Sequence, residues 1–277
     1  MKVKLGLHDD PVKKALVAQA VQMRRNTVKV LRGPGMEPLH DLRITALREN
    51  FALKFFRKFI NGNTGTLRDE LVRARKVMAK RRDWDIAAPR INKNFQVLNM
   101  ASFQNQKALK LMRSEKAKAR DNLVVMLKSY PYKKMLRDLK QIATARNTRK
   151  IDPQILLKDT LKELKRQQES SLHPAVLHKI RITLKNLRYA CEFFSDFYDK
   201  EKIQSLIADI VDVQDVLGEY QDGENTLRKI NCLRMTEKSR GITKLKEIEE
   251  RHTIKARKDF VKIWKSKKCR RIFGAFP

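Results

Sequence analysis

The sequence predicts an all-α protein. Its 277 residues include only nine glycines and eight prolines, and leucine, lysine, arginine, alanine and glutamine recur at a spacing of three to four residues. The alternation of β-branched residues that is typical of strands is scarce. Hydrophobic residues make up 42 % of the chain, which is enough for a core, and charged residues make up 34 %. We therefore expect helices with apolar faces and a densely charged surface.

Start and stop signals place several of these helices. Aspartate–proline pairs at residues 10–11 and 152–153 supply an N-cap followed by a first-turn proline. The first of the two helices is expected to end at about Arg32, before a Gly-Pro-Gly sequence, and the second at about residue 170. Long helices rich in lysine and arginine are expected over residues 103–128 and 243–265. The chain thus contains two sets of similar elements.

An internal duplication explains this similarity. The segment that begins at His40 aligns without gaps with the one that begins at His178, at an offset of 138 residues. Arginine follows each histidine by three residues, and isoleucine, threonine, alanine and three phenylalanines recur at matched positions. A second pair of segments, from Leu67 and from Leu206, aligns at an offset of 139. We therefore expect two related halves, residues 1–145 and 146–277.

The charge of the chain indicates a polyanionic partner. Lysine and arginine number 63 against 31 acidic residues, which leaves a formal charge of +32. This excess is spread along the chain, whereas a basic tail would confine it to one end. A charge of this size repels itself unless an anion is near. Non-specific nucleic-acid binding and binding of another polyanion are the two readings that follow.

One helix gathers its cations into a stripe. At 100° per residue, four side chains from His178 to Arg188 fall within an arc of about 80°; they are His178, Arg181, Lys185 and Arg188. Apolar residues lie on both sides, Ile180, Leu184 and Leu187 on one and Ile182 and Tyr189 on the other. The face farthest from the stripe is expected to hold Lys179, Thr183, Asn186 and Ala190. A solvated outer face is the usual meaning of a charge run, but these apolar flanks favour a cleft between helices, where cations need an anion.

The first half repeats the stripe imperfectly. The equivalent arc holds five side chains, which are His40, Arg43, Lys54, Arg57 and Lys58. Leu47 and Asn50 stand where the second half has a lysine and an arginine. The two histidines, each followed by an arginine, are expected either to contact an anion or to cap the N-terminus of their helix.

These motifs together resemble the CHAD family, the conserved-histidine α-helical domains. The resemblance rests on His40-xx-Arg43, on His178-xx-Arg181-xxx-Lys185-xx-Arg188-Tyr189, on Arg82-Asp83-x-Asp85 and on the segment Leu217-Gly-Glu-Tyr-Gln-Asp222, and it covers about residues 10–268. It implies two helical bundles of roughly four helices each, related by a pseudo-twofold axis, with a central basic channel that binds inorganic polyphosphate. It adds further basic positions to the two stripes, which are Lys116, Arg120, Arg251, Lys255 and Lys258. Asp83, Asp85 and Asp222 are interpreted as partners of buried basic residues or as caps, not as catalytic acids.

Other function classes are less well supported by the residues. Aromatic residues are only 7 % of the chain and are clustered at core spacing, so platforms for nucleobases are not evident. His40-Asp41 resembles part of a metal-dependent phosphohydrolase motif, but its repeat counterpart carries Lys179, which cannot bind a metal while charged. We therefore expect no enzyme activity, no cofactor and no metal. A hub for acidic protein partners stays open.

The sequence also bears on location. Three cysteines without CxxC spacing favour a reducing compartment. Charged residues interrupt the first ten positions, and no run of 18 apolar residues occurs, so neither a signal peptide nor a membrane span is expected. We expect a cytoplasmic protein without a membrane partner. Association with polyphosphate granules is one purpose of binding that the resemblance leaves open.

Overall fold

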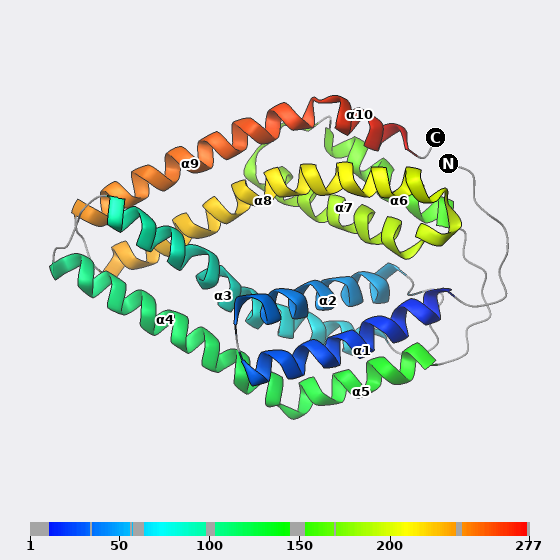
Figure 1. Ribbon diagram of the computed structural model, residues 1–277, viewed down its shortest axis with the longest axis horizontal. Coiled ribbons are helices and arrows are strands. Elements are labelled where there is room, and N and C mark those ends of the chain that lie inside the picture. Colours follow the sequence, from blue (N-terminus) through cyan, green and yellow to red (C-terminus); the bar gives the residue numbers. More distant parts are fainter. Residues whose placement is uncertain are drawn as a thin grey trace. The chain divides into compact units, whose positions relative to one another are not determined.

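The structure is a computed structural model that describes residues 11–33, 35–55, 57, 64–97, 103–144, 153–168, 170–236 and 240–275. Within these ranges the chain is helical apart from short turns and contains no strand, so the predicted all-α class is confirmed. The helices are α1 (Pro11–Arg32), α2 (Met36–Phe55), α3 (Thr64–Val97), α4 (Phe103–Lys128), α5 (Tyr130–Thr144), α6 (Pro153–Gln168), α7 (Pro174–Phe193), α8 (Lys200–Thr236), α9 (Arg240–Trp264) and α10 (Lys267–Gly274) (Figure 1).

These helices form two compact units. The unit that we call the N-unit holds the described part of residues 10–149 together with residues 225–250. The C-unit holds the described part of residues 150–224 and 251–277. The end of α8 and the beginning of α9 therefore belong with α1 to α5. The expected boundary between residues 145 and 146, and the predicted N-caps Asp10 and Asp152, lie outside the described residues.

Helices α2 and α7 show the duplication most directly. Each is 20 residues long, and their first and last residues keep the offset of 138 found in the sequence. His40 and His178 each occupy the fifth position of their helix. Neither histidine can therefore cap the N-terminus, because α2 begins at Met36 and the N-cap of α7 is His173. The capping role considered for the pair is wrong.

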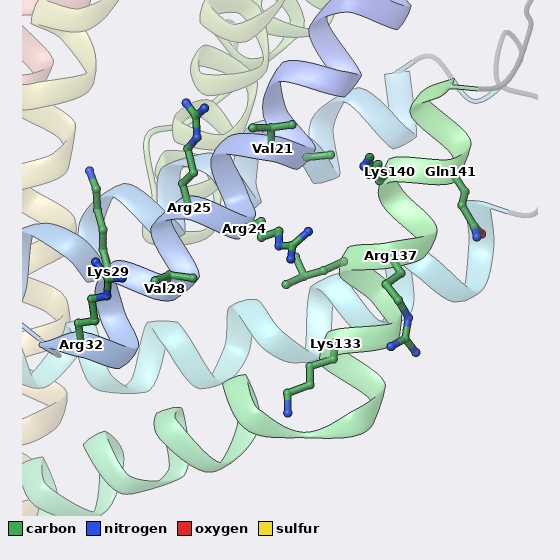
Figure 2. A pocket seen from close by; sticks show the side chains of 12 residues that line it. Val21, Arg24, Arg25, Val28, Lys29, Arg32, Lys133, Arg137, Lys140 and Gln141 are labelled. Carbon is green, nitrogen blue, oxygen red and sulfur yellow. The ribbon is translucent and has the colours of Figure 1, made fainter.

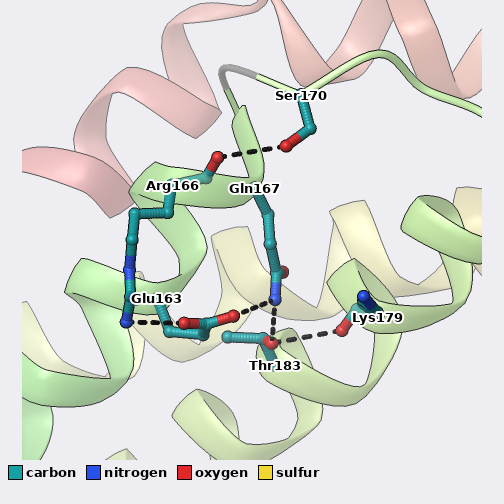
Figure 3. Close-up of polar contacts among 6 residues, drawn as sticks. All are labelled: Glu163, Arg166, Gln167, Ser170, Lys179 and Thr183. Atoms are coloured by element: carbon teal, nitrogen blue, oxygen red, sulfur yellow. Dashed lines mark hydrogen bonds and ion pairs between the residues drawn. The ribbon is translucent and has the colours of Figure 1, made fainter.

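An equivalent buried hydrogen bond connects each of these helices to the helix before it. In the C-unit, Gln167 Nε2 on α6 donates to Thr183 Oγ1 on α7 at 3.0 Å, and Thr183 donates to the Lys179 carbonyl (Figure 3). In the N-unit, Asn26 Nδ2 on α1 donates to Thr45 Oγ1 on α2 at 2.9 Å, and Thr45 donates to the Asp41 carbonyl. Thr45 and Thr183 are related by the offset of 138. The duplication therefore extends to a buried polar contact.

The N-unit is built around α1, α2, α3 and α5, and α1 packs against both α2 and α5 (Figure 1). Its core includes Met23 from α1, Leu42 from α2, Leu71 from α3 and Tyr132 from α5. The Tyr132 hydroxyl shares a hydrogen bond of 2.8 Å with Thr27 of α1. Helix α5 was not predicted from the sequence, although Ser129 and Pro131 are residues typical of the start of a helix. Ser129 Oγ accepts a hydrogen bond from the Tyr132 amide at 3.4 Å.

A second core cluster explains why residues 225–250 belong to the N-unit. Trp84 and Ile91 of α3 and Met112 of α4 pack in one cluster with Ile230 of α8 and Leu245 of α9. All five side chains are at least nine-tenths buried. Burial of this much apolar surface is the main favourable term in folding, so these helix ends are held by the N-unit.

In the C-unit, α8 is the helix on which α9 and α10 are held. Arg271 of α10 makes two hydrogen bonds to the Asp209 carboxylate, of 2.8 and 2.6 Å. Helices α8 and α9 approach each other closely at Gly223, where an added Cβ would clash with the Thr253 side chain. Only glycine, which has no Cβ, leaves room for the β-branched Thr253 at this crossing.

Two glycines of α8 therefore predict opposite effects of the same substitution. Gly223→Ala should destabilise the protein by about 1–3 kcal/mol, because the methyl group forces Thr253 and α9 to move. Gly218→Ala should stabilise it by about 0.5–1 kcal/mol, since alanine favours a helix and nothing lies within 4 Å of the added atom. Urea denaturation of the two variants measures both effects. Equal effects of the same sign would contradict the close crossing.

Glu49 stands at a position where the other half has an apolar residue, and its burial predicts that the stability of the protein depends on pH. Glu49 of α2 stands where α7 has Leu187, its side chain is 1 % exposed, and burial raises its pKa from 4.5 to about 8. The unfolded chain loses this proton near pH 4.5, whereas the folded protein holds it until about pH 8. The contribution of Glu49 to stability is therefore complete below pH 4.5 and is lost as the pH rises through about 8. The melting temperature of Glu49→Gln, minus that of the parent protein, should increase between pH 5 and pH 8; a constant difference would contradict this prediction.

Candidate functional site

The basic stripe of α7 lies at the edge of its buried face, beside α8. The expected apolar side is confirmed, because Ile180, Leu184 and Leu187 are fully buried. Next to them, Arg181, Lys185 and Arg188 are half-buried, and His178 is exposed. The stripe therefore follows the seam between α7 and α8 and does not lie on a fully solvated surface. We call these four residues the α7 stripe.

The predicted arrangement of the remaining α7 faces is partly wrong. Thr183 and Ala190 were placed with Lys179 on the face farthest from the stripe, but both are buried. The reason is that α6 covers this side of α7 and bonds to Thr183 through Gln167 (Figure 3). Ile182, expected to be an apolar flank, is 46 % exposed. The stripe therefore has a continuous apolar border only on the side of Leu184.

Polar residues of α8 face the stripe. His178 Nδ1 lies 3.4 Å from Gln221 Oε1. Arg188 Nε donates to Glu192 at 2.9 Å, its terminal Nη1 donates to Gln214 of α8 at 3.2 Å, and its guanidinium lies 5.7 Å from the centre of the Tyr189 ring. Arg188 is thus held in place by three groups of its own chain. Any anion that it binds must share it with Glu192.

The charge of Arg181 is only partly compensated by its surroundings. Burial lowers its pKa below the usual 12.5, and the negative charge of Asp222 on α8 opposes this effect. Its buried Nε atom has no hydrogen-bond partner among the described residues. Arginine stays charged under these conditions, so an additional anion beside it would recover part of the energy lost by burial. Asp222 therefore acts as the structural partner that the sequence predicted.

The basic residues of α9 lie on a different surface from the α7 stripe. Arg251, Lys255 and Lys258 are exposed, and they occupy the side of α9 opposite Thr253, which packs on α8. The resemblance grouped them with the α7 stripe, but the structure does not bring them into the seam between α7 and α8. They form a separate exposed row in the C-unit.

In the N-unit, Asp85 of α3 gathers two cations. Its carboxylate is fully buried and forms ion pairs with Arg81 Nη1 at 2.6 Å and with Lys116 Nζ of α4 at 3.3 Å. The interpretation of Asp85 as a partner of buried basic residues is confirmed. Lys116 had been assigned to the anion site, yet its ammonium group is already paired. Arg81 was not predicted as the partner of Asp85, because the motif contains the neighbouring Arg82 instead.

The other basic positions of the N-unit are more accessible. Arg43 is half-buried, whereas His40, Lys54, Arg57 and Arg120 are exposed. Arg120 Nε lies 3.2 Å from Asp121, and both side chains are more than half exposed, so this pair has little effect on charge or stability. Lys58 lies outside the described residues. Most of the predicted site residues of the N-unit are therefore exposed, whereas three of the four residues of the α7 stripe are half-buried.

Comparison with known proteins settles the family of this chain. The family model described as the CHAD domain matches residues 14–228. The chain belongs to the CHAD family. Its fold is similar to that of the crystal structure of the CHAD domain from the plant Ricinus communis, with a TM-score of 0.77 and 19 % identity over 95 % of this chain and 94 % of that one. It is also similar to PptA from Streptomyces chartreusis, with a TM-score of 0.73 and 17 % identity over 93 % and 99 % of the two chains. None of the curated proteins matches the sequence.

The described residues of this CHAD chain can be compared with the requirements of metal sites, disulfides and membrane spans. No three histidine, cysteine, aspartate or glutamate side chains come together as a metal site within the described ranges. The cysteines in that part of the chain are free thiols, and Cys191 and Cys269 are buried. None of the described helices has a segment long and apolar enough to span a bilayer.

The Asp85 cluster leads to a stability prediction. Asp85→Asn should destabilise the protein by about 3–5 kcal/mol, because it leaves the buried Arg81 guanidinium without its counter-ion. Asp121→Asn is the matched control, since its partner Arg120 is exposed, and it should change stability by less than about 1 kcal/mol. Urea denaturation near neutral pH measures both effects. A small effect of Asp85→Asn would show that Lys116 and Arg81 are compensated by other groups.

Proposed function

We propose that this chain binds inorganic polyphosphate, and that the α7 stripe is the principal contact in the C-unit. The observation that supports the proposal most directly is Arg181, a half-buried cation whose Nε has no hydrogen-bond partner among the described residues. Lys185, also half-buried, lies one helical turn along the same row. The CHAD family is associated with polyphosphate binding in general.

The chemistry of the stripe suits a chain of phosphates. Polyphosphate carries negative charge at every phosphorus and has no apolar part. Successive cations of the stripe lie about 4.5–6 Å apart along the helix axis, as three- and four-residue steps require. Arginine supplies two parallel N–H donors to a phosphate, and lysine supplies a mobile point charge. A row of this kind can bind successive phosphates of one chain without reading any sequence.

We propose that the N-unit contributes through its own accessible cations. Arg43 and His40 occupy the positions of Arg181 and His178, and Lys54, Arg57 and Arg120 supply exposed positive charge. Lys116 contributes less, because its ammonium group already pairs with the Asp85 carboxylate, which it shares with Arg81. On the same grounds, the exposed row of Arg251, Lys255 and Lys258 contributes by general attraction and not by a built site.

Nucleic acid is the alternative ligand, and the charge of +32 favours it. The residues that face the α7 stripe argue against it as the principal ligand. Gln214, Gln221 and Asp222 are polar, and Tyr189, the aromatic group beside Arg188, is 3 % exposed and cannot stack on a base. Nucleic acid is therefore expected to bind more weakly and with greater sensitivity to salt.

We also propose that binding involves no catalysis and takes place in the cytoplasm, where attachment to polyphosphate granules is one use of it. Phosphate release from polyphosphate by the pure protein with magnesium or manganese would contradict the first part. Loss of granule attachment in cells that carry an α7 stripe variant would support the second.

Removal of the stripe charges tests the site. Arg181→Gln together with Lys185→Gln should weaken binding of long-chain polyphosphate by at least about tenfold, equivalent to about 1.4 kcal/mol. Lys200→Gln together with Lys202→Gln removes the same charge from exposed positions of α8 and should change binding by less than about threefold, since exposed charges contribute little. Isothermal titration at physiological salt measures both affinities, and circular dichroism confirms that the variants fold. Equal losses would show that diffuse charge is responsible.

Competition tests the ligand. Long-chain polyphosphate bound to the protein should resist displacement by duplex DNA or single-stranded RNA at matched phosphate concentration and physiological salt. The expected order follows from the polar stripe, which offers ion pairs to phosphate and no surface to bases. Fluorescence anisotropy of labelled polyphosphate measures the displacement. If either nucleic acid displaces polyphosphate at equal or lower concentration, the preference proposed here is wrong.

A further inference from the structure

A groove between α1 and α5 of the N-unit is separate from all the positions discussed above. It has a volume of about 1000 Å³ and is lined by twelve residues, which are Ala20, Val21, Arg24, Arg25, Val28, Lys29, Arg32, Lys133, Leu136, Arg137, Lys140 and Gln141 (Figure 2). None of the histidine-helix residues lines it, and neither Lys116 nor Arg120 does. Both walls of the groove come from the same compact unit.

The groove combines an apolar floor with two basic rims. Ala20, Val21, Val28 and Leu136 supply the apolar part. Val21 is 37 % exposed and Val28 is 42 % exposed, so water reaches this surface. Figure 2 shows Arg25 and Lys29 extending on the side of α1 away from α5, and Lys133 and Arg137 extending on the side of α5 away from α1. Arg24 extends between the two helices.

The cations of the two rims share one spacing. Arg25, Lys29 and Arg32 follow each other at intervals of four and three residues on α1, and Lys133, Arg137 and Lys140 do the same on α5. Each row therefore extends for about 10 Å along its helix. None of the twelve lining residues is acidic. Of these cations, Arg25 and Lys29 have no ion-pair partner in the part of the chain that the structure describes.

We propose that this groove binds an amphipathic helix of a partner protein, with acidic side chains on both flanks of an apolar stripe. An acidic helix matches the rims because its side chains repeat at the same three- and four-residue intervals. Its apolar stripe covers the valines and the leucine of the floor, as in other helix-in-groove complexes. Charge complementarity at the rims supplies orientation and a fast encounter, while the floor supplies the apolar contact.

The apolar floor separates this occupant from other anions. A phosphate chain has no apolar group to place against Val21, Val28 and Leu136, and no aromatic side chain lines the groove for stacking on bases. A second copy of this chain is disfavoured by its own charge of +32. A bilayer surface is flat on this scale and would leave a concave floor uncovered.

A designed peptide tests the groove. The probe is a fluorescent helix of about 18 residues, long enough to form a helix, with leucines at three- and four-residue spacing between two rows of glutamates. A scrambled peptide of the same composition and a version with alanine in place of leucine are its controls. The designed peptide should bind the full-length protein at physiological salt at least about tenfold more tightly than either control, a difference of about 1.4 kcal/mol. Equal binding of the scrambled peptide would overturn the proposal.

Substitutions of groove residues test whether the peptide binds in the groove. Arg25→Ala, Lys29→Ala and Arg137→Ala together should weaken peptide binding by about tenfold, since three modest contributions from exposed charge pairs are lost together. Lys162→Ala, Lys165→Ala and Lys179→Ala together remove the same charge from exposed positions of α6 and α7 and should change binding by less than about twofold. Val21→Ser with Val28→Ser should weaken binding of the leucine peptide and leave the alanine version unaffected. Equal losses in the two triple variants would overturn the proposal.

Polyphosphate, duplex DNA and phosphatidylserine vesicles complete the test with the same variants. The groove triple variant should bind polyphosphate like the parent protein, so failure of the groove and failure of the proposed polyphosphate site give different results. If polyphosphate, DNA or vesicles lose more affinity in this variant than the peptide does, the groove is a site for that ligand and the proposed occupant is wrong.

Discussion

The seating of α2 and α7 by buried threonines is the contact on which the rest of the arrangement depends. Thr45 and Thr183 each receive an amide hydrogen bond from the preceding helix, and each returns its hydroxyl proton to a carbonyl of its own helix. A buried polar group without a partner costs about 1–3 kcal/mol, so this geometry specifies one rotation of each helix. That rotation buries the apolar side of α7 and leaves the cations of the stripe at its edge. The position of the candidate site is thus set by a contact on another side of the same helix.

The two units use the same framework for different electrostatic purposes. In the C-unit, the position of Arg181 has Asp222 nearby and an Nε atom without a partner among the described residues. In the N-unit, the fully buried carboxylate of Asp85 holds Arg81 and Lys116 between α3 and α4. A buried ion pair adds little to the free energy of unfolding, but removal of one partner is costly. Such a pair therefore fixes the local geometry more than it increases stability. Asp85 therefore has a structural role, whereas Arg181 is the cation on which the proposed polyphosphate site depends.

Positive charge in this CHAD chain is organised on at least three kinds of surface. The α7 stripe is half-buried beside polar groups, the α9 row is exposed opposite its packing face, and the α1–α5 groove has an apolar floor. Each surface favours a different anion, because the groups around a cation determine whether the rest of the ligand should be polar or apolar. A polar seam suits phosphate alone, whereas an apolar floor suits an anion that also carries hydrocarbon. Net charge by itself does not distinguish them.

Local periodicity and the internal repeat determined the all-α class and the 138-residue offset between the two histidine segments, because both are properties of short segments. The bounds of α2 and α7, and with them the fifth position of each histidine, came only from the structure. The pairing of Asp85 with a basic residue also followed from its motif. Tertiary structure alone decided that α6 covers Thr183 and that Lys116 pairs with Asp85. It also turned the basic row of α9 away from α8; this row is Arg251, Lys255 and Lys258. It also brought α5 beside α1 and so created the groove. A helical pattern predicts which residues share a face of a helix. Which neighbour covers that face depends on segments distant in the chain, so the sequence pattern does not predict it. The contacts that illustrate this are Gln167 with Thr183 and Asp85 with Lys116, and the groove that places Arg25 and Arg137 on its two walls.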